Sequence, residues 1–209
     1  MRTLTLEESL KTARRNGIRT AKWREARNEK ELRLALQATG FPAVIKVNSE
    51  KASHKSDAGG VALGLATIKQ AIAAFRRMKR IPGFRSAIVQ ETAKGHEIIL
   101  GAKRDVQFGP VLLIGMGGIY AEVLEDTAIA LCPVSKGRAL RMLKSLRGAK
   151  ILSGIRGQEG IDFAAAAEQA ARLSRMMAKH SEITEVDLNP VMASHKGAVA
   201  VDARIVEEE

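Results

Sequence analysis

Hydrophobic residues recur along this chain in two patterns. Spacing of three and four residues, typical of a helix with one buried face, alternates with short apolar runs that are typical of buried strands. The first pattern predicts helices at about 5–16, 28–40, 67–78, 135–146 and 163–179. The second predicts strands at 18–23, 43–47, 61–65, 86–90, 96–103, 111–114, 120–124, 127–131, 183–188 and 199–205. Because helices and strands are mixed without strict β-α-β alternation, the pattern favours an α+β fold.

The most informative stretch is FPAVIKVNSEKASHKSDAGGVALG, in which a polar loop separates two apolar runs. Lys46 is the one charge inside the first run, and a buried lysine is costly unless an anion meets it. The loop contains His54 and Lys55 and ends in Gly59-Gly60, where backbone N–H groups can approach an oxyanion closely. This order indicates a phosphate-binding flap. The alternative is an ordinary hairpin with a solvated histidine.

Charge is distributed unevenly along the 209 residues, which suit one large domain or two small lobes. Residues 1–85 contain 19 Lys and Arg against 7 Asp and Glu, whereas residues 86–209 contain 15 against 16. A basic N-terminal half predicts contact with an anion such as a nucleotide, phosphate, coenzyme A, an acidic partner or nucleic acid. The aromatic content of 3% leaves few side chains to stack on bases, and the absence of a nucleic-acid motif also argues against nucleic acid.

Cysteine content and hydropathy indicate the compartment. The single cysteine, Cys132, cannot form an internal disulfide and fits a reducing environment. The sequence has no signal-like apolar segment at its start and no apolar run long enough to span a bilayer. We therefore expect a cytoplasmic protein without membrane contact.

Oxygen-bearing side chains gather near the C-terminus. Asp187 and Asn189 lie at the end of one predicted strand, and Asp202 lies on the strand that returns beside it. Mg²⁺ prefers oxygen ligands and needs only one or two protein carboxylates when phosphates supply the rest. Asn189 and Asp202 are therefore candidate Mg²⁺ ligands. The alternative is that Asp187 and Asn189 only shape the turn before Pro190.

Several segments, taken together and in order, resemble the ATP-grasp β subunit of ADP-forming acetyl-CoA (acyl-CoA) synthetases, which are relatives of the succinyl-CoA synthetase β chain. They are FPAVIKVNS, HKSDAGGVALGL, VQETAKGHEIILGAKRDVQFGPVLLIGMGGIYAEVLED, EVDLNPV and AVDARI. The resemblance implies an ATP-grasp fold, in which two α+β lobes hold a nucleotide between them. We expect an N-terminal lobe at 1–91 that carries the His54 loop and a C-terminal lobe at 92–209 that binds ribose and Mg²⁺.

The resemblance also implies an activity. These ligases reversibly convert an acyl-CoA, ADP and phosphate to a free acid, CoA and ATP, through an acyl phosphate and phosphohistidine. The CoA-binding chemistry belongs to an α subunit, so this chain should be active only with that partner, in a heterotetramer of two α and two β subunits. The motifs do not specify the carboxylic acid, ATP or GTP preference, or the physiological direction.

Residue roles follow from the resemblance position by position. The family motif HK[ST]D-x-GGV falls on residues 54–61, so His54 resembles the histidine that relays phosphate to ADP. Glu91 resembles the hinge residue near adenine, and Glu97 resembles the carboxylate that binds the ribose hydroxyls. The remaining expected contacts are listed together: Lys46, Lys55, Gly59 and Gly60 for the nucleotide phosphates, and Asn189 and Asp202 for Mg²⁺.

Two other functions stay open at this point. One is a non-catalytic regulatory ATP-grasp module, and the other is a different ATP-grasp ligase that forms an amide bond through an acyl phosphate. A degenerate regulatory copy should lack His54, Lys46 or Asp202, and all three are present, which favours the enzyme. The other ligases do not need the histidine of the HKSDAGGV motif, so phosphate trapped on His54 would separate them from the synthetase.

Overall fold

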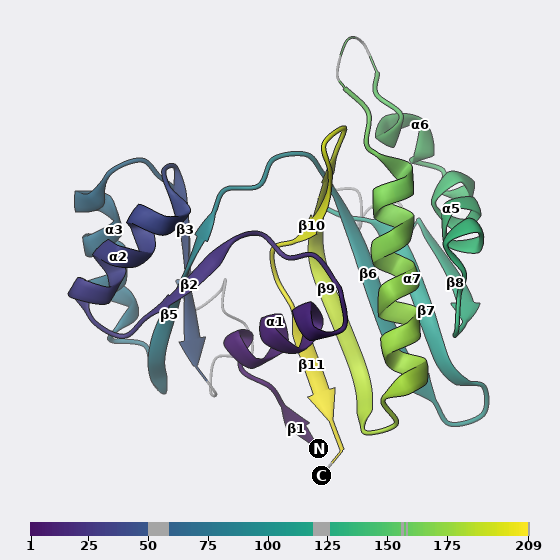
Figure 1. Cartoon of the computed structure of the whole chain (residues 1–209), viewed down its shortest axis with the longest axis horizontal. Coiled ribbons are helices and arrows are strands. Elements are labelled where there is room, and N and C mark those ends of the chain that lie inside the picture. Colours follow the sequence, from purple (N-terminus) through teal and green to yellow (C-terminus); the bar gives the residue numbers. More distant parts are fainter. Residues whose placement is uncertain (50–58, 119–125, 156, 158, 209) are drawn as a thin grey trace. The chain divides into compact units, whose positions relative to one another are not determined.

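The computed structural model describes residues 1–49, 59–118, 126–155, 157 and 159–208 (Figure 1). The chain forms two compact units, each described here by itself. Unit 1 comprises Met1–Thr3, Ser9–Thr20 and Ala93–Glu209, and unit 2 comprises Leu4–Glu8 and Ala21–Thr92. Helix α1 (Leu6–Arg15) therefore contributes to both units. Along the described parts of the chain, no helix is both long enough and apolar enough to cross a membrane.

Unit 2 is a four-stranded antiparallel sheet with two helices, α2 (Glu29–Thr39) and α3 (Ile68–Met78), on one face (Figure 1). Its strand order is β2-β5-β3-β4, where β2 is Trp23–Ala26, β3 is Ala43–Ser49, β4 is Val61–Leu65 and β5 is Phe84–Glu91. Alternate strand residues point to opposite faces. Ile45 and Val89 thus join Phe75 and Met78 of α3 in a fully buried core. The strands predicted at 43–47, 61–65 and 86–90 are confirmed.

Local capping explains where the helices of unit 2 begin. The side chain of Asn28 accepts a hydrogen bond from the Glu31 N–H at 2.9 Å, at the N-terminus of α2. Thr67 and Gln70 form a capping box at the start of α3, in which each side chain accepts from the backbone N–H of the other. Such caps satisfy N–H groups that have no partner within the helix. Both predicted helices are confirmed.

Unit 1 is built on a seven-stranded sheet within the described residues, with α5 (Lys136–Ser145) and α7 (Phe163–Lys179) lying across one face (Figure 1). The order is β1-β11-β9-β6-β7-β8, with β10 paired to β9. The bounds are β1 Arg2–Thr3, β6 His96–Asp105, β7 Gly109–Met116, β8 Thr127–Leu131, β9 Ile183–Ser194, β10 Gly197–Ala200 and β11 Arg204–Glu207, with a short helix α6 at Ala149–Leu152. The small side chains of α7 permit close packing on the sheet, since its alanines at 166, 167, 170 and 171 are fully buried.

Part of the N-terminal segment packs in unit 1, so unit 2 differs from the predicted lobe at 1–91. Strand β1 pairs with β11, and the buried side chain of Gln169 on α7 bonds to both backbone groups of Arg19. The strand predicted at 18–23 is wrong, because Thr20 makes only an isolated bridge and β2 begins at Trp23. Ile18 is buried without belonging to a strand, which explains the misleading apolar pattern. The strand predicted at 120–124 lies outside the described residues.

Two corrections concern the C-terminal strands. The strand predicted at 183–188 does not end at Pro190, because β9 continues to Ser194. Its pairing with β6 shifts register between Ile98 and Leu100, so the strand absorbs one extra residue as a bulge. The strand predicted at 199–205 is instead two strands, β10 and β11, separated by residues 201–203. The bulge and the break lie next to each other, and both shape the candidate metal site.

Candidate functional site

Asn189 and Asp202 lie opposite each other in unit 1. Strands β10 and β11 pair with β9 in the same antiparallel register on either side of the break. Within the break, the Val201 N–H donates to the Pro190 carbonyl at 3.1 Å. Asp202 follows Val201 in the break, and Asn189 precedes Pro190 on β9, so the same antiparallel register puts Asp202 opposite Asn189. The structure therefore brings together the two residues predicted as Mg²⁺ ligands.

A third oxygen-bearing side chain adds negative charge beside this pair. Asp187 lies two residues before Asn189 on β9, and burial raises the pKa of its carboxyl group. Repulsion from Glu185 and Asp202 raises this pKa further, whereas Arg204 opposes the shift. A cation at this position would relieve the repulsion, and amide and carboxylate oxygens are the ligands that Mg²⁺ prefers. The residues present therefore fit a magnesium ion.

Protein ligands alone do not complete a metal site here. Among the described residues, no three His, Cys, Asp or Glu side chains come together in a way that would hold a metal ion. Mg²⁺ is commonly bound by one or two carboxylates plus the phosphates of a substrate. A site made of Asn189 and Asp202 is of that kind, since it leaves most coordination positions to water and phosphate oxygens.

Glu97 shares the face of the sheet on which this pair lies. It is exposed near the start of β6 and pairs with Met192 on β9, three residues beyond Asn189. On both strands the intervening residues Ile98 and Val191 are fully buried. Leu188, next to Asn189, is fully buried as well, so Glu97 and Asn189 each lie beside a residue that points toward α7 and themselves face the other side. The extra residue in the β9 bulge keeps Asn189 on the same face as Met192, although the two are three residues apart. Because the bulge takes up one β9 residue in this interval, roughly two strand positions, or about 7 Å along the strands, separate Glu97 from Asn189, so both can contact different parts of one extended ligand.

Two glycines allow the chain to pass directly beside Glu97. The Gly117 N–H donates to the Glu97 carbonyl at 2.9 Å, and a Cβ at Gly117 would lie 2.9 Å from the backbone carbon of Glu97. Gly118 has a φ of +65°, and a Cβ there would lie 3.1 Å from Oε2 of Glu97. The residue that these two glycines approach is the one that resembles the ribose-binding carboxylate.

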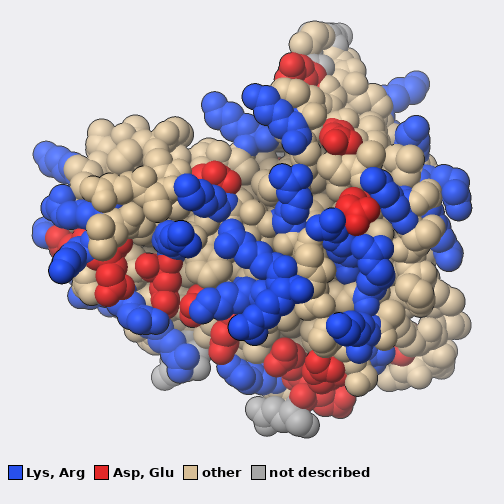
Figure 2. Space-filling model, in the orientation of Figure 1, with Lys and Arg blue, Asp and Glu red and all other residues tan. Residues whose placement is uncertain are grey.

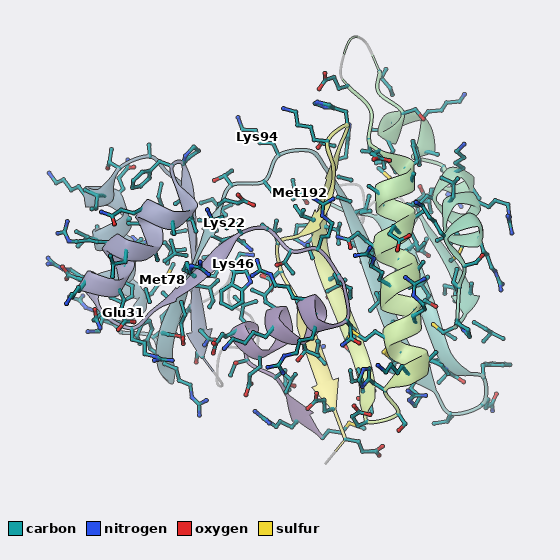
Figure 3. All side chains as sticks on the ribbon, in the orientation of Figure 1. Lys22, Glu31, Lys46, Met78, Lys94 and Met192 are labelled. Atoms are coloured by element: carbon teal, nitrogen blue, oxygen red, sulfur yellow. The ribbon has the colours of Figure 1, made fainter. Side chains whose placement is uncertain are left out.

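Unit 2 carries a buried polar face on the side of its sheet opposite α2 and α3. Lys46 (labelled in Figure 3) is 5% exposed and alternates with the core residue Ile45, so it points away from the helices. Asn48 lies on the same face and donates to Ser86 Oγ at 3.0 Å. The chain enters β4 beside this face, because the Val47 N–H donates to the Gly60 carbonyl at 2.7 Å.

Gln90 belongs to the same polar face and was not predicted as a site residue. It pairs with Val44 on β3 and is 1% exposed, and its side-chain Nε2 has no hydrogen-bond partner within the described parts of the chain. A buried amide without a partner is costly, and such a group often contacts a ligand. The run Ser-Ala-Ile-Val-Gln gave no signal, because one polar residue at the end of an apolar strand has no characteristic spacing.

Glu91 ends β5 and is held by the neighbouring chain segment. Its Oε1 accepts a hydrogen bond from the Lys22 N–H at 2.7 Å, and its own N–H donates to the Lys22 carbonyl at 3.0 Å. One carboxylate oxygen therefore fixes the segment that leads into β2. Gly59 adopts a φ of +66° before β4, as expected for a glycine turn. His54 and Lys55 lie outside the described residues.

The surroundings of Cys132 and His180 indicate structural rather than catalytic roles. Burial raises the pKa of the Cys132 thiol, which disfavours the nucleophilic thiolate. His180 ends α7, where Nδ1 lies 2.9 Å from a Glu182 oxygen and Nε2 lies 3.1 Å from Asn16 Oδ1. Neither group was predicted to be catalytic.

Two α+β units that carry a basic polar face and an acidic, oxygen-rich face are typical of an ATP-grasp protein. The chain matches the ATP-grasp domain family over residues 1–206 and therefore belongs to that family. It is 34% identical over 198 residues to acetate–CoA ligase [ADP-forming] I subunit beta of Pyrococcus furiosus, covering 91% of this chain and 85% of that subunit. The predicted resemblance is confirmed.

A longer relative matches over the same region. The chain is 36% identical over 206 residues to acetate–CoA ligase [ADP-forming] I of Archaeoglobus fulgidus, covering 95% of this chain. The match covers only 30% of that relative, so this chain spans less than a third of its length. Chemistry carried by the remainder of such a protein must come from elsewhere if this chain takes part in the same reaction.

Solved structures confirm the predicted ATP-grasp fold. The dinucleotide forming acetyl-coenzyme A synthetase 1 of Ca. Korarchaeum cryptofilum, in complex with coenzyme A, Ca-AMPCP and HgCl⁺, matches with a TM-score of 0.93 at 34% identity, over 99% of this chain and 94% of that one. Another structure of that synthetase holds coenzyme A and Mg-AMPPCP, with its phosphohistidine segment pointing towards the nucleotide binding site. It matches with a TM-score of 0.87 at 33% identity, over 99% and 93% of the two chains.

Proposed function

We propose that this chain is the nucleotide-binding, phosphoryl-transferring β subunit of an ADP-forming acyl-CoA synthetase. The reaction is acyl-CoA, ADP and phosphate to free acid, CoA and ATP, in either direction. The observation that carries the proposal is the nearly end-to-end similarity to the Pyrococcus furiosus beta subunit, together with Glu97, Asn189 and Asp202 on one face of the unit 1 sheet.

Unit 1 supplies the ribose and metal contacts in this proposal. The exposed carboxylate of Glu97 accepts hydrogen bonds from the ribose hydroxyls, and Asn189 and Asp202 hold Mg²⁺. When bound, Mg²⁺ neutralises charge on the nucleotide phosphates. The separation of about 7 Å along the strands suits a nucleotide that lies with its ribose at Glu97 and its phosphates at Asn189 and Asp202.

Unit 2 supplies the phosphate contacts. The Lys46 ammonium and the Gly59 and Gly60 N–H groups stabilise phosphate oxygens as charge redistributes during transfer. Lys55 adds a second cation from the flap, and Gln90 contributes its buried amide. Glu91 lies at the end of β5, where one carboxylate oxygen remains for contact near the adenine.

His54 relays phosphorus between the two proteins. A neutral imidazole nitrogen attacks the phosphorus of the partner's phosphohistidine, so that one N–P bond forms on His54 while the N–P bond on the partner breaks. A terminal oxygen of ADP then attacks the same phosphorus, which forms the P–O bond of ATP and returns the imidazole. Alignment and charge neutralisation carry most of the catalysis in such transfers.

The partner that this scheme requires is a CoA-binding α subunit. We propose a heterotetramer with two α and two β subunits in the cytoplasm, where ATP, ADP and CoA are available. The relatives named as beta subunits support a multi-subunit enzyme. The acid is selected on the partner, so this chain does not determine it.

Reconstitution tests the proposal. The isolated chain should bind Mg-ADP without forming ATP from acyl-CoA and phosphate, and adding the CoA-binding subunit should restore ATP formation. His54→Ala should abolish turnover and keep Mg-ADP binding, whereas the control His195→Ala, at an exposed histidine with no role in the proposal, should keep both. Acid-labile phosphate on His54 would distinguish this enzyme from other ATP-grasp ligases. Full turnover by the His54→Ala variant would remove the relay from the mechanism.

A further inference from the structure

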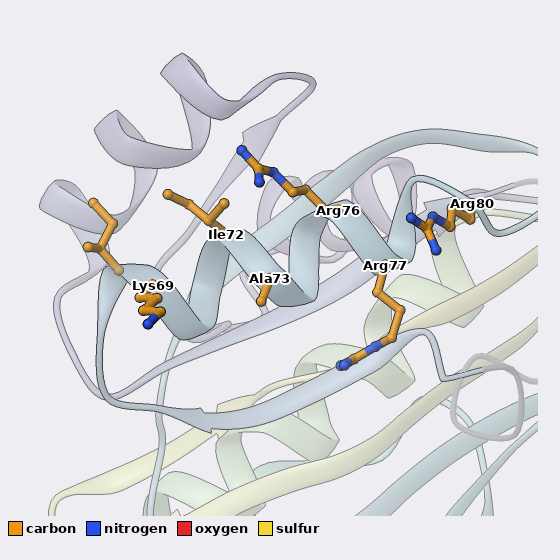
Figure 4. Close-up of a pocket in the computed structure, with 7 residues that line it drawn as sticks. Lys69, Ile72, Ala73, Arg76, Arg77 and Arg80 are labelled. Atoms are coloured by element: carbon orange, nitrogen blue, oxygen red, sulfur yellow. The ribbon is translucent and has the colours of Figure 1, made fainter.

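Helix α3 presents a basic groove that contains none of the predicted site residues. Residues 68–80 contain five Lys and Arg and no Asp or Glu. A shallow groove of about 670 Å³ runs along the exposed side of this helix (Figure 4). We call it the α3 groove. It has an apolar floor of Ile68, Ile72 and Ala73 and a rim that includes Lys69, Arg77 and Arg80.

Most of the α3 groove lies away from the core of unit 2, although Ile72 of its floor also packs against that core. The core side of the helix consists of Ala71, Ala74, Phe75 and Met78, all at most 2% exposed. Lys69 and Arg77 lie on a different stripe of the helix, Arg80 follows in the turn after it, and all three are exposed. Ile68, at the N-terminal end of the floor, is 40% exposed although it is a large aliphatic side chain. The groove thus combines exposed apolar area with a row of cations.

The charge of the rim is not compensated within the described part of the chain. Arg76 is held by Glu29 of α2, with contacts of 2.6 and 3.2 Å to its two carboxylate oxygens. Lys69, Arg77 and Arg80 form no ion pair with any described residue. Basic side chains also predominate over acidic ones on the face of the molecule in Figure 2. An anionic partner would therefore meet cations that no described acidic residue neutralises.

The geometry of the groove decides between kinds of anion. Lys69 and Arg77 are eight residues apart on α3, which places them roughly 12 Å from each other along the helix, too far for one phosphate group. A nucleic-acid backbone would gain nothing from the aliphatic floor, and the groove contains no aromatic side chain for stacking. An amphipathic helix matches both features, because its apolar residues cover the floor while carboxylates reach the rim.

We propose that the α3 groove docks an acidic amphipathic helix of the CoA-binding subunit. The identity of the partner rests on the proposed function, whereas the chemistry of the docked segment rests on the groove itself. Carboxylates spaced three to four residues apart on that helix pair with Lys69, Arg77 and Arg80. Aliphatic residues beside them pack on Ile68, Ile72 and Ala73.

Charge reversal on matched helices tests this docking. The variant Arg77→Glu/Arg80→Glu changes the groove, and Arg138→Glu/Arg141→Glu makes the same charge change on exposed positions of α5. Affinity for the full CoA-binding subunit is measured by isothermal titration calorimetry at low and at high salt. The groove variant should bind about tenfold more weakly at low salt, while the α5 variant binds like the unmodified chain. Mg-ADP affinity should not change in either variant.

The apolar floor is tested separately. Ile68→Asp should weaken association at high salt as well, where exposed charges are screened. Unchanged partner affinity in both the groove variant and Ile68→Asp would overturn the docking proposal, even if the complex makes ATP. The docking proposal would also be overturned if the groove variant lost affinity for a short DNA duplex but kept its affinity for the partner. A charge-dependent complex that makes no ATP would instead refute the proposed function and leave the docking intact.

Discussion

Replacing Gly118 by alanine tests whether Glu97 binds the nucleotide. Gly118 has a φ of +65°, which an alanine adopts only at a cost of about 1–2 kcal/mol. The new Cβ would lie 3.1 Å from Oε2 of Glu97, so the carboxylate must move by a few tenths of an ångström. Because that carboxylate ends a flexible, exposed side chain, its movement should add little to the loss of stability. The main consequence should be a misplaced carboxylate.

Gly109→Ala is the matched control. Gly109 has a φ of +73°, and a Cβ there would have no other heavy atom within 4 Å. Both variants carry the same kind of backbone strain, so their free energies of unfolding should agree within about 0.5 kcal/mol in urea titrations. Only Gly118→Ala should bind Mg-ADP more weakly, by about three- to tenfold, which corresponds to one hydrogen bond lost or weakened.

The comparison separates a role in binding from a role in folding. Isothermal titration calorimetry with Mg-ADP, on both variants and on Glu97→Gln, gives the three affinities needed. If Gly118→Ala and Gly109→Ala bind Mg-ADP equally well, the Glu97 carboxylate does not contact the nucleotide, and the assignment of the ribose site is refuted.

Three further variants test other parts of unit 1. Gln169→Leu should lower the free energy of unfolding by about 2–4 kcal/mol in urea, because it removes three hydrogen bonds to backbone groups of Arg19 and Ala198 and leaves the Arg19 N–H without this partner, while the Arg19 carbonyl keeps its bond from the Ala200 N–H; a loss below that range would contradict this account. Asp202→Asn should raise the Mg²⁺ concentration needed for tight ADP binding by about tenfold, and an unchanged Mg²⁺ titration would exclude Asp202 as a ligand. The pKa of Asp187 is raised above its ordinary 3.8, so this carboxyl group favours folding below pH 3.8, and that contribution is lost as the pH rises through the folded-state pKa. Asp187→Asn should accordingly gain stability relative to the unmodified chain at pH 7 but not at about pH 3, and an equal difference at both would contradict the assignment.

Helix positions were predictable because their first residues carry local signals. Asn28, Thr67, Ser135 and Asp162 each cap a helix with a side-chain oxygen that accepts from the backbone three residues on. This interaction depends only on neighbours in sequence, so a single sequence suffices to find it. The prediction of a strand at 18–23 was wrong for the opposite reason. Ile18 is buried in unit 1, and nothing local distinguishes such a residue from a strand residue.

The two candidate Mg²⁺ ligands were predictable in composition but not in geometry. Asn189 and Asp202 were expected on neighbouring strands, and the structure places them opposite each other. The sequence did not show that β9 passes through Pro190, because the register shift that accommodates this residue is set by pairing with β6, about 90 residues away in the chain. Nor did it show the break at 201–203, which removes Asp202 from regular strand pairing.

In the polar face of unit 2, one charged residue indicated a candidate site from the sequence, whereas the other residues of that face gave no signal. All seven residues of β3 are buried, so burial alone does not distinguish the two faces of this strand. The alternation of side chains along β3 distinguishes them, because Ile45 packs under the helices while Lys46 and Asn48 point to the other side. A lysine in an apolar run is costly enough to be noticed from the sequence. Burying the neutral amide of Gln90 on β5 costs less free energy than burying a charge. Gln90 could be assigned only once the strand pairing had placed it on the same face as Lys46.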